Sequence, residues 1–265
     1  MILPASYLNG FAPRDGQPLY PSLWKGCVGA WNPGLGPSGS VLRDQSGFKN
    51  NGTLTNGPTF AASQGRYAMS FDGTDDYVDF GDNNVLNCTV SLAISMWAKR
   101  NGTGGGTYHA WVQRFSGATV GYQLYVPNSD NIVRFYTNTV LASSYVMSDT
   151  NWHHLCVTNN SSTTSFFIDG IPYGSGSQSL VSVTAATVKN FGNFSAGGKI
   201  NGFIDDARIY NRPLSPDEIR LLATRRGIAY EMAPRRRLSV QVTVAPLRYN
   251  LFSGSIGNTD VIGAS

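Results

Sequence analysis

Carboxylate side chains are the first candidates for chemistry in this sequence. Hydrolysis of a glycosidic bond needs two carboxyl groups that flank the bond. Glu218 and Glu231 are the only glutamates, and they lie at the start of an expected helix and in the C-terminal tail. Asp205 and Asp206 are adjacent, but neighbours on a strand point to opposite faces, so they cannot act on one bond. The carboxylates therefore predict a non-enzymatic protein, with a glycoside hydrolase-related enzyme as the least favoured alternative.

Five aspartates gather in one short segment that also contains Gly and Asn, namely Asp72, Asp75, Asp76, Asp79 and Asp82. Clustered carboxylates supply the hard oxygen ligands that Ca²⁺ prefers. Aspartate beside glycine also forms turns, because its carboxylate accepts hydrogen bonds from nearby backbone amides. We favour turn formation and expect no cofactor; calcium binding near Asp72–Asp82 is the alternative.

Histidine and cysteine are too sparse to predict a metal site. His153 and His154 are adjacent and His109 lies in another segment, so no spacing suits zinc. The three cysteines, Cys27, Cys88 and Cys156, cannot all pair within one chain, and each lies in an apolar or strand-like context. We expect buried thiols without disulfides.

Aromatic residues are the remaining candidates for binding. A sugar-binding surface needs exposed rings with amide or carboxylate groups nearby. The candidate ligand-binding residues are Tyr108, Trp111, Tyr122, Tyr125 and Tyr136. For most of the tyrosines, packing in the core or at a sheet edge is the alternative.

The elements that would position these residues are short strands. Apolar runs separated by Gly- and Asn-rich breaks are typical of a sandwich. The expected strands are 67–71, 77–80, 89–99, 108–115, 122–126, 132–137, 153–159, 164–168, 186–191 and 202–210. Asn51-Gly52 and Asp169-Gly170 have the residue types of tight hairpin turns. One helix is expected over 215–225, because Pro216 suits the first helical position and Glu218 completes a capping box.

Composition argues against several kinds of partner. With 41% hydrophobic residues over 265 positions, the chain can bury a sizeable core. The net charge of +4 reflects arginines gathered at 208–237, where only Tyr210 and Tyr230 supply aromatic rings, so we expect no nucleic-acid groove. No apolar run reaches transmembrane length, so we expect no membrane insertion.

Four runs occur in order along the chain: MSFDGTDDYV at 69–78, NWHHLCV at 151–157, FFIDG at 166–170 and GFIDDARIYNRPLSPDEI at 202–219. Together they resemble the laminin G-like, concanavalin A-like jelly roll. The resemblance implies an all-β sandwich of two antiparallel sheets with one short C-terminal helix. It also implies that His153 and His154 lie on a structural strand, one ring inward and one outward. Trp31, Trp97 and Trp152 match positions that the family buries.

The resemblance covers roughly 26–227, which we expect to be a laminin G-like jelly-roll domain. Residues 1–25 contain Pro4, Pro13, Pro18 and Pro21, which predict an extended N-terminal arm. Residues 228–265 lie beyond the family pattern, and the strict alternation at 238–244 predicts a strand followed by a tail. This strand pairs either with the edge of its own domain or with another chain, as an anchor.

The N-terminal residues and the arms suggest a setting for the protein. Residues 1–10 lack the basic and apolar regions of a secretion signal, whereas jelly rolls of the resembled type usually work outside cells. A virion surface protein of a phage, made in the host cytoplasm and displayed as a capsid decoration or fibre component, reconciles the two. We expect an oligomeric assembly whose terminal arms bind capsid or other virion proteins, and whose jelly roll binds host-surface glycans or neighbouring capsid subunits. A cellular carbohydrate-binding module is the alternative.

Overall fold

The computed structural model describes residues 18–231, except 104–105, 118, 184 and 193–196. Two predictions therefore lie outside the described residues: most of the N-terminal arm at 1–25, and the strand and tail at 238–265. The anchoring role of both segments stays a prediction.

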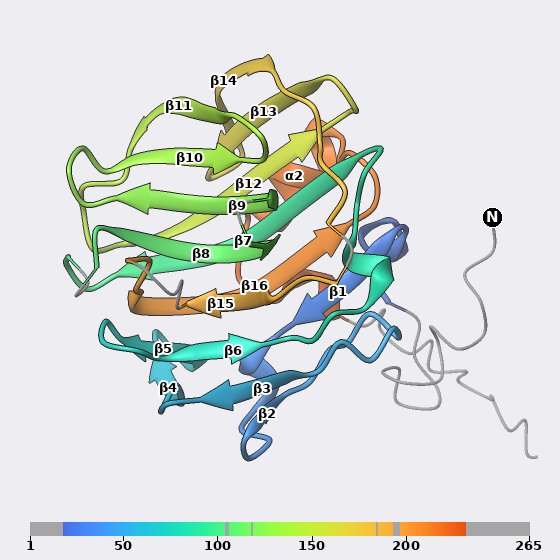
Figure 1. The fold of residues 1–265 in the computed structure, drawn as a ribbon. Helices are drawn as coiled ribbons and strands as arrows, with labels where there is room; N and C mark the ends of the chain where they lie inside the picture. The colour runs from blue at the N-terminus through green and yellow to red at the C-terminus, as the bar shows by residue number, and fades with distance from the viewer. Residues whose placement is uncertain (1–17, 104–105, 118, 184, 193–196, 232–265) are drawn as a thin grey trace, which may run out of the picture. The chain divides into compact units, whose positions relative to one another are not determined.

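Two eight-stranded antiparallel sheets face each other, with the front sheet toward the viewer and the rear sheet behind it in Figure 1. The front sheet has the order β11 (Val140–Val146), β10 (Ile132–Tyr136), β9 (Thr119–Pro127), β8 (Tyr108–Ser116), β15 (Val188–Gly192), β6 (Tyr77–Asp79), β3 (Gly52–Thr55) and β2 (Val41–Leu42). The rear sheet has the order β14 (Ile171–Ser177), β13 (Thr163–Ile168), β12 (Trp152–Asn159), β7 (Leu92–Arg100), β16 (Asn201–Tyr210), β5 (Arg66–Asp72) and β4 (Thr59–Ser63), with β1 (Cys27–Trp31) also paired to β16. The predicted all-β sandwich is confirmed.

All ten expected strands are present, with ends that differ by up to three residues. The strands that the sequence did not predict include four at sheet edges, β2, β4, β11 and β14. Most residues of β11 and β14 are exposed or half-buried, and β14 contains Pro172 and two glycines. Alternation of apolar and polar residues marks only strands with one buried face, so edge strands give little signal.

Aromatic side chains fill the space between the sheets. Trp31 is fully buried; its ring lies 5.2 Å from that of Phe80 and 5.1 Å from that of Phe191, centroid to centroid. Its Nε1 donates a 2.7 Å hydrogen bond to the carbonyl of Asn50. The buried indole therefore has its polar atom satisfied, while its ring reaches from β1 of the rear sheet to aromatic rings of the front sheet. The prediction that Trp31 is buried is confirmed.

A second apolar layer covers the outer face of the rear sheet. It contains α2 (Pro216–Leu222) and two short 3₁₀ helices, η1 (Pro21–Trp24) and η4 (Ile228–Tyr230). The helix begins with the predicted capping box between Ser215 and Glu218, but it ends at Leu222, earlier than expected. The packed layer includes Trp24 and Ile228, which lie just outside the expected domain limits.

The other two tryptophans that were expected to be buried, Trp97 and Trp152, differ from Trp31 in position. Trp97 is half-buried on the outer face of the rear sheet, where its Nε1 donates to the carbonyl of Leu222 at 3.2 Å. Trp152 is 9% exposed and lies 4.3 Å from the guanidinium of Arg226. The expectation of burial is thus wrong for Trp97 and correct for Trp152. Both side chains contact α2 or the chain that follows it, Trp97 at Leu222 and Trp152 at Arg226.

The two predicted hairpin turns have different outcomes. Asp169 (φ 51°) and Gly170 (φ 77°) both take left-handed conformations between β13 and β14, as a tight hairpin requires. Gly52 does not, so the turn predicted at Asn51-Gly52 is wrong. A Cβ at Gly52 would lie 2.4 Å from Val78 Cγ1, so glycine serves close packing of β3 on β6 at this position.

The described chain enters and leaves the sandwich at one place. The amide of Leu19 donates to the carbonyl of Glu231 at 2.7 Å, and Trp24 Nε1 donates to the carbonyl of Ala229 at 2.9 Å. These contacts join segments about two hundred residues apart in sequence. None of the described helices has the length and apolar character needed to cross a membrane.

Candidate functional site

The outer face of β8, β9 and β10 carries a polar and aromatic surface. Leu124 and Phe135 pair with each other and point into the core, so their strand neighbours point outward. The register places Tyr125 opposite Arg134, and Gln123 opposite Tyr136. We call this surface the tyrosine face; its members are Tyr108, Gln113, Gln123, Tyr125, Arg134 and Tyr136. The three tyrosines and the arginine are half-buried, whereas Gln113 and Gln123 are buried at 0% and 5% exposure.

Two tyrosines of this face contact each other, and a chain of amides lies beside them. The rings of Tyr108 and Tyr125 meet edge to face with centroids 5.3 Å apart, and both are half-buried. Gln123 Nε2 donates to Gln113 Oε1 at 3.2 Å, and Gln113 Nε2 donates to Asn190 Oδ1 at 2.6 Å. Because each carboxamide holds the next, these polar groups keep fixed orientations next to the rings.

The charges of the tyrosine face are balanced locally. Arg134 forms an ion pair with Asp130 at 2.5 Å, on the turn between β9 and β10. Burial raises the pKa of Tyr125, and Arg134 opposes this effect. Burial also raises the pKa of Tyr108, with Gln123 opposing it through a hydrogen bond. Both phenols therefore keep their protons near neutral pH and can donate hydrogen bonds to a neutral polar ligand.

Three of the five predicted ligand-binding residues lie on this face, and two do not. Tyr108, Tyr125 and Tyr136 come together, whereas Trp111 and Tyr122 are 0% and 1% exposed in the core. The assignment of these two residues to a binding surface is therefore wrong. A register shift between Ala110 and Val112 accompanies the inward position of Trp111.

The amide and guanidinium groups of the tyrosine face were not among the predicted ligand-binding residues. Gln123 precedes Tyr125 by two residues on β9, and Arg134 precedes Tyr136 by two residues on β10. Residues two apart on a strand share a face, so this spacing is the signal that could have found them. Gln113 lies beyond the irregularity in β8, and simple alternation does not reach it.

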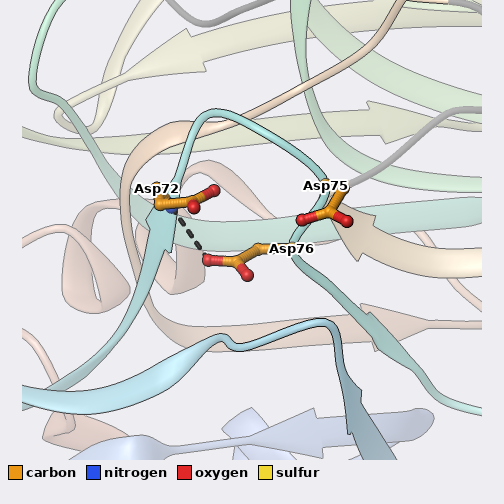
Figure 2. Close-up of side chains that lie close together, drawn as sticks. All are labelled: Asp72, Asp75 and Asp76. Atoms are coloured by element: carbon orange, nitrogen blue, oxygen red, sulfur yellow. Dashed lines mark hydrogen bonds between the residues drawn. The ribbon is translucent and has the colours of Figure 1, made fainter.

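Three of the five clustered aspartates meet at one turn, between β5 and β6 (Figure 2). Single carboxylate oxygens of Asp72, Asp75 and Asp76 lie within 4.8 Å of one another. Asp72 Oδ1 accepts a hydrogen bond from the amide of Thr74 at 2.7 Å, and Asp76 Oδ2 accepts one from the amide of Asp72 at 2.9 Å. The predicted turn role is confirmed, and the cluster is also compatible with calcium, because its carboxylates supply hard oxygen ligands.

The other two aspartates of that segment lie apart from the cluster. Asp79 Oδ1 accepts from the amide of Gly81, and Asp82 forms an ion pair with Arg114 at 2.5 Å.

Burial raises the pKa of Asp76, with repulsion from Asp72 and Asp75 adding to the effect. Lys199 Nζ donates to the carbonyl of Thr74, so a protein ammonium group already lies beside the three-aspartate turn.

Asp205 and Asp206 do not lie on opposite faces, which corrects the expectation from strand alternation. The register of β16 shifts between Asp205 and Arg208, and Asp206 has a φ of 45°. Both carboxylates therefore reach the segment 226–227: Asp205 lies 3.6 Å from Arg226 Nη1, and Asp206 accepts from the amide of Gly227 at 2.9 Å. A β-bulge re-aims a side chain in this way.

Both carboxylates are buried among arginines and are closed to a substrate. Asp205 is 0% exposed and pairs with Arg66 Nε at 2.9 Å; Asp206 is 2% exposed and pairs with Arg208 Nε at 3.0 Å. Burial raises the pKa of Asp205 to about 7, although Arg66 opposes the effect. We call Arg66, Asp205, Asp206, Arg208 and Arg226 the buried charge cluster.

The two adjacent histidines have the predicted opposite orientations. His154 is 1% exposed on the outer face of the rear sheet, where its Nε2 lies 2.8 Å from Ser95 Oγ, and burial lowers its pKa to about 4. His153 contacts Asp169 Oδ2 at 2.7 Å and Asp149 Oδ1 at 2.9 Å, and the hydrogen bond that its ring donates to Asp169 raises the pKa of His153. Among the residues that the structure describes, the three-aspartate turn is the only group of three such ligands close enough for a metal.

The cysteines are structural. Cys27, Cys88 and Cys156 are buried and form no disulfide, as predicted. Burial raises the pKa of Cys27 and of Cys88 to about 12 and raises that of Cys156 further, which keeps all three as thiols.

A family model described as the concanavalin A-like lectin/glucanases superfamily matches residues 72–220, which is more than half of the chain. The match spans β6 to most of α2 and includes all of the tyrosine face. No curated protein sequence matches the chain.

Several solved structures share the fold at low sequence identity. Domain 4 of AbnA, an extracellular arabinanase from Geobacillus stearothermophilus in complex with arabinotriose, superposes with a TM-score of 0.59 and 17% identity over 74% of this chain and 98% of that chain. Trypanosoma rangeli sialidase in complex with sialic acid has a TM-score of 0.58 and 15% identity over 75% of this chain and 33% of that chain. The receptor-binding domain of a botulinum neurotoxin mosaic serotype C/D has a TM-score of 0.57 and 16% identity, over 76% and 51%. This chain thus spans a third of the sialidase and about half of the toxin domain.

Proposed function

Because the chain belongs to the concanavalin A-like lectin/glucanase superfamily, we propose that it is a non-enzymatic adhesion protein that binds glycans on its tyrosine face. One observation carries the proposal: the edge-to-face pair of Tyr108 and Tyr125 beside the fixed amides of Gln113 and Gln123. Half-buried rings offer a flat apolar surface to a sugar, and their phenol groups offer hydrogen bonds to its hydroxyl groups. The buried amides of Gln113 and Gln123 hold fixed positions beside the rings. The arabinotriose and sialic acid held by two structural neighbours belong to the same ligand class.

The positions of the acids support a non-enzymatic role. Glu218 receives two hydrogen bonds from Arg212, at 2.7 and 2.8 Å, and caps α2. Asp205 and Asp206 are enclosed in the buried charge cluster. Ser95 and His154 form a pair that resembles a nucleophile and its base, but both are 1% exposed and the low pKa of His154 makes it a poor base. Hydrolysis needs such groups to reach a substrate.

Cation binding is not needed for the proposed function. Calcium at the turn of Asp72, Asp75 and Asp76 stays a prediction, and the two backbone hydrogen bonds to these carboxylates support a structural role instead. The tyrosine face lies on other strands, β8 to β10, and its hydrogen-bonding groups are amides, phenols and the Arg134 guanidinium.

Replacement of Tyr125 by alanine tests the tyrosine face. On a panel of immobilised animal, bacterial and plant glycans, we expect the purified protein to bind at least one class, and Tyr125→Ala to weaken that binding by about tenfold or more. Loss of the ring removes both its own contact area and its support for Tyr108. Tyr67→Ala is the matched control, because Tyr67 is 40% exposed on β5 of the other sheet. Binding that Tyr125→Ala and Tyr108→Ala both leave unchanged would refute the proposal.

We further propose that the protein acts on a virion surface, as a capsid decoration or fibre component made in the host cytoplasm, and that it works in an oligomeric assembly. Support comes from the sequence: the proline-rich segment 1–25 and the alternating run 238–244 suit attachment to capsid or other virion proteins. A cellular carbohydrate-binding module is the alternative, with the same tyrosine face and a different location.

Purified particles distinguish the two settings. If the virion proposal holds, the chain is expected in a fixed stoichiometry in particles purified by density gradient, and deletion of residues after Arg237 is expected to abolish incorporation. Absence from particles, together with tight sugar binding by the isolated protein, would favour the cellular alternative. Unchanged incorporation of the shortened chain would contradict the anchoring role of the tail.

A further inference from the structure

A cavity at one edge of the sandwich lies well away from the tyrosine face. It is lined by residues that follow β1, by the start of the segment after β2, and by Phe60 of β4. Strand β2 is four positions along the front sheet from β8. The hollow has a volume of about 220 Å³, smaller than the sites that take drug-sized ligands, so it suits a single small ring. We call it the edge cavity.

Apolar side chains form part of its wall. Leu42 is 3% exposed and belongs to the core, Phe60 is half-buried against that core, and Leu35 is 53% exposed. Leu35 belongs to η2 (Pro33–Leu35), a short 3₁₀ turn. A large exposed leucine beside a half-buried ring gives the cavity an apolar surface that water covers poorly.

An unneutralised cation lies on the same wall. Arg43 is exposed and forms no ion pair with the described residues. Its neighbour Asp44 cannot balance it, because the Asp44 carboxylate is buried and accepts hydrogen bonds from the amides of Ala30, Ser46 and Asn50. No acidic residue lines the cavity, so its lining is net positive.

The third feature is a buried carboxamide with unused hydrogen-bonding capacity. Gln45 lines the cavity and is 7% exposed. Its Oε1 has no hydrogen-bond partner, and its Nε2 makes only a long contact of 3.5 Å with the carbonyl of Arg43. Buried polar side-chain atoms nearly always have partners, so an unsatisfied one calls for an explanation. A ligand in the cavity would supply the missing donor once the loosely held amide turns toward it.

We propose that the edge cavity binds a carboxylated monosaccharide unit, of the uronic acid class, as a second site separate from the tyrosine face. Arg43 pairs with the carboxylate, since guanidinium groups match carboxylates in shape and charge. Gln45 accepts a hydrogen bond from a sugar hydroxyl, and Ser38 lies on the same lining. The carbon-bound hydrogens of the ring pack on Phe60 and Leu35. A ligand of this class can pair with the charge of Arg43, hydrogen-bond to the amide of Gln45 and pack on the apolar wall at the same time.

Titration with sodium glucuronate tests the site, with methyl glucoside as the neutral counterpart. In amide-detected NMR spectra of the full chain, we expect glucuronate to shift the signals of Arg43, Gln45 and their neighbours, and methyl glucoside to bind more weakly. Arg43→Ala is expected to weaken glucuronate binding by about tenfold or more. Arg220→Ala is the matched control, because Arg220 is equally an exposed arginine but lies on α2. Added salt is expected to weaken glucuronate binding and spare the glucoside.

Three outcomes are informative about the edge cavity alone. Gln45→Met keeps the length of the side chain and removes its amide, so weaker binding by this variant supports the assigned role of Gln45. Glucuronate binding that Arg43→Ala and Gln45→Met both leave unchanged would overturn the proposal, as would the absence of shifts at these residues. Tyr125→Ala is expected to leave the glucuronate response intact, so failure of the tyrosine face and failure of the edge cavity are distinguishable.

Discussion

Arg208→Met is expected to lower the free energy of unfolding by about 3–5 kcal/mol. Arg208 is fully buried, and its guanidinium carbon lies 4.6 Å from the ring centre of Trp24 and 4.7 Å from that of Tyr230. Its Nε donates to Asp206 at 3.0 Å. Methionine fills much of the same space, so the main loss is the charge. Asp206 would then be buried without its cation.

The arginine also connects three parts of the fold. Its Nη1 donates to the carbonyl of Leu23 at 3.4 Å, so it contacts η1, η4 and β16 at once. Asp206 and the other charges nearby raise the pKa of Arg208 further above its ordinary value, although burial opposes them. Arg208 therefore stays charged at all relevant pH values, and the cluster depends on its pairing with Asp206.

Chemical denaturation of single and double variants measures this effect. Arg208→Met combined with Asp206→Leu removes both charges, and we expect it to recover much of the stability that Arg208→Met loses. Arg220→Ala, at an exposed ion pair, is expected to change the unfolding free energy by less than about 1 kcal/mol. If Arg208→Met proved as mild as Arg220→Ala, the buried charge cluster would not hold η1 and η4 on the sheet.

Asp44→Ala is expected to destabilise the protein by about 3–5 kcal/mol, since several buried donors lose one acceptor. The Asp44 carboxylate accepts from the amides of Ala30 (2.9 Å), Ser46 (2.8 Å) and Asn50 (2.8 Å), and from Ser46 Oγ (2.7 Å). It thereby ties β1 to the loop that follows β2. Burial raises the pKa of Asp44, although these hydrogen bonds oppose it.

Thermal and chemical unfolding of Asp44→Ala and Asp217→Ala would measure this contribution. Asp217 is an aspartate whose side chain is 92% exposed, on α2, and its removal is expected to cost less than about 1 kcal/mol. Asp44→Asn keeps one acceptor oxygen and should fall between the two. A loss for Asp44→Ala no larger than that for Asp217→Ala would show that water replaces the carboxylate and that the loop does not depend on it.

The sequence predicted the parts of the fold in which the pattern of apolar, capping and turn residues agrees with the burial and conformation in the structure. The strand 202–210, the capped helix start at Ser215 and the hairpin at Asp169-Gly170 follow from alternation, capping chemistry and turn chemistry, and all three are present. Alternation failed at two register shifts, in β8 near Trp111 and in β16 near Asp206. A bulge adds one residue to a strand and reverses the facing of those beyond it, and single-sequence patterns do not reveal it.

The candidate site was found only in part for the same reason. Tyr108, Tyr125 and Tyr136 were predicted by their aromatic type, together with Trp111 and Tyr122, but the last two are core residues. Aromatic type alone does not separate a binding ring from a packed one. The edge cavity could not be predicted at all, because Phe60 of β4 and Gln45 after β2 come together only through the packing of one sheet against the other.

The contact between Leu19 and Glu231 has a consequence for how the domain can be built into larger proteins. The described part of the chain enters and leaves the sandwich at one point, so the sandwich can be inserted into a surface loop of a host protein. The two residues of the host loop that flank the insertion can then stay close together. Closing so short a gap costs little chain entropy. The same geometry suits circular permutation: a short peptide can link 231 to 19, and new ends can open in an exposed turn elsewhere.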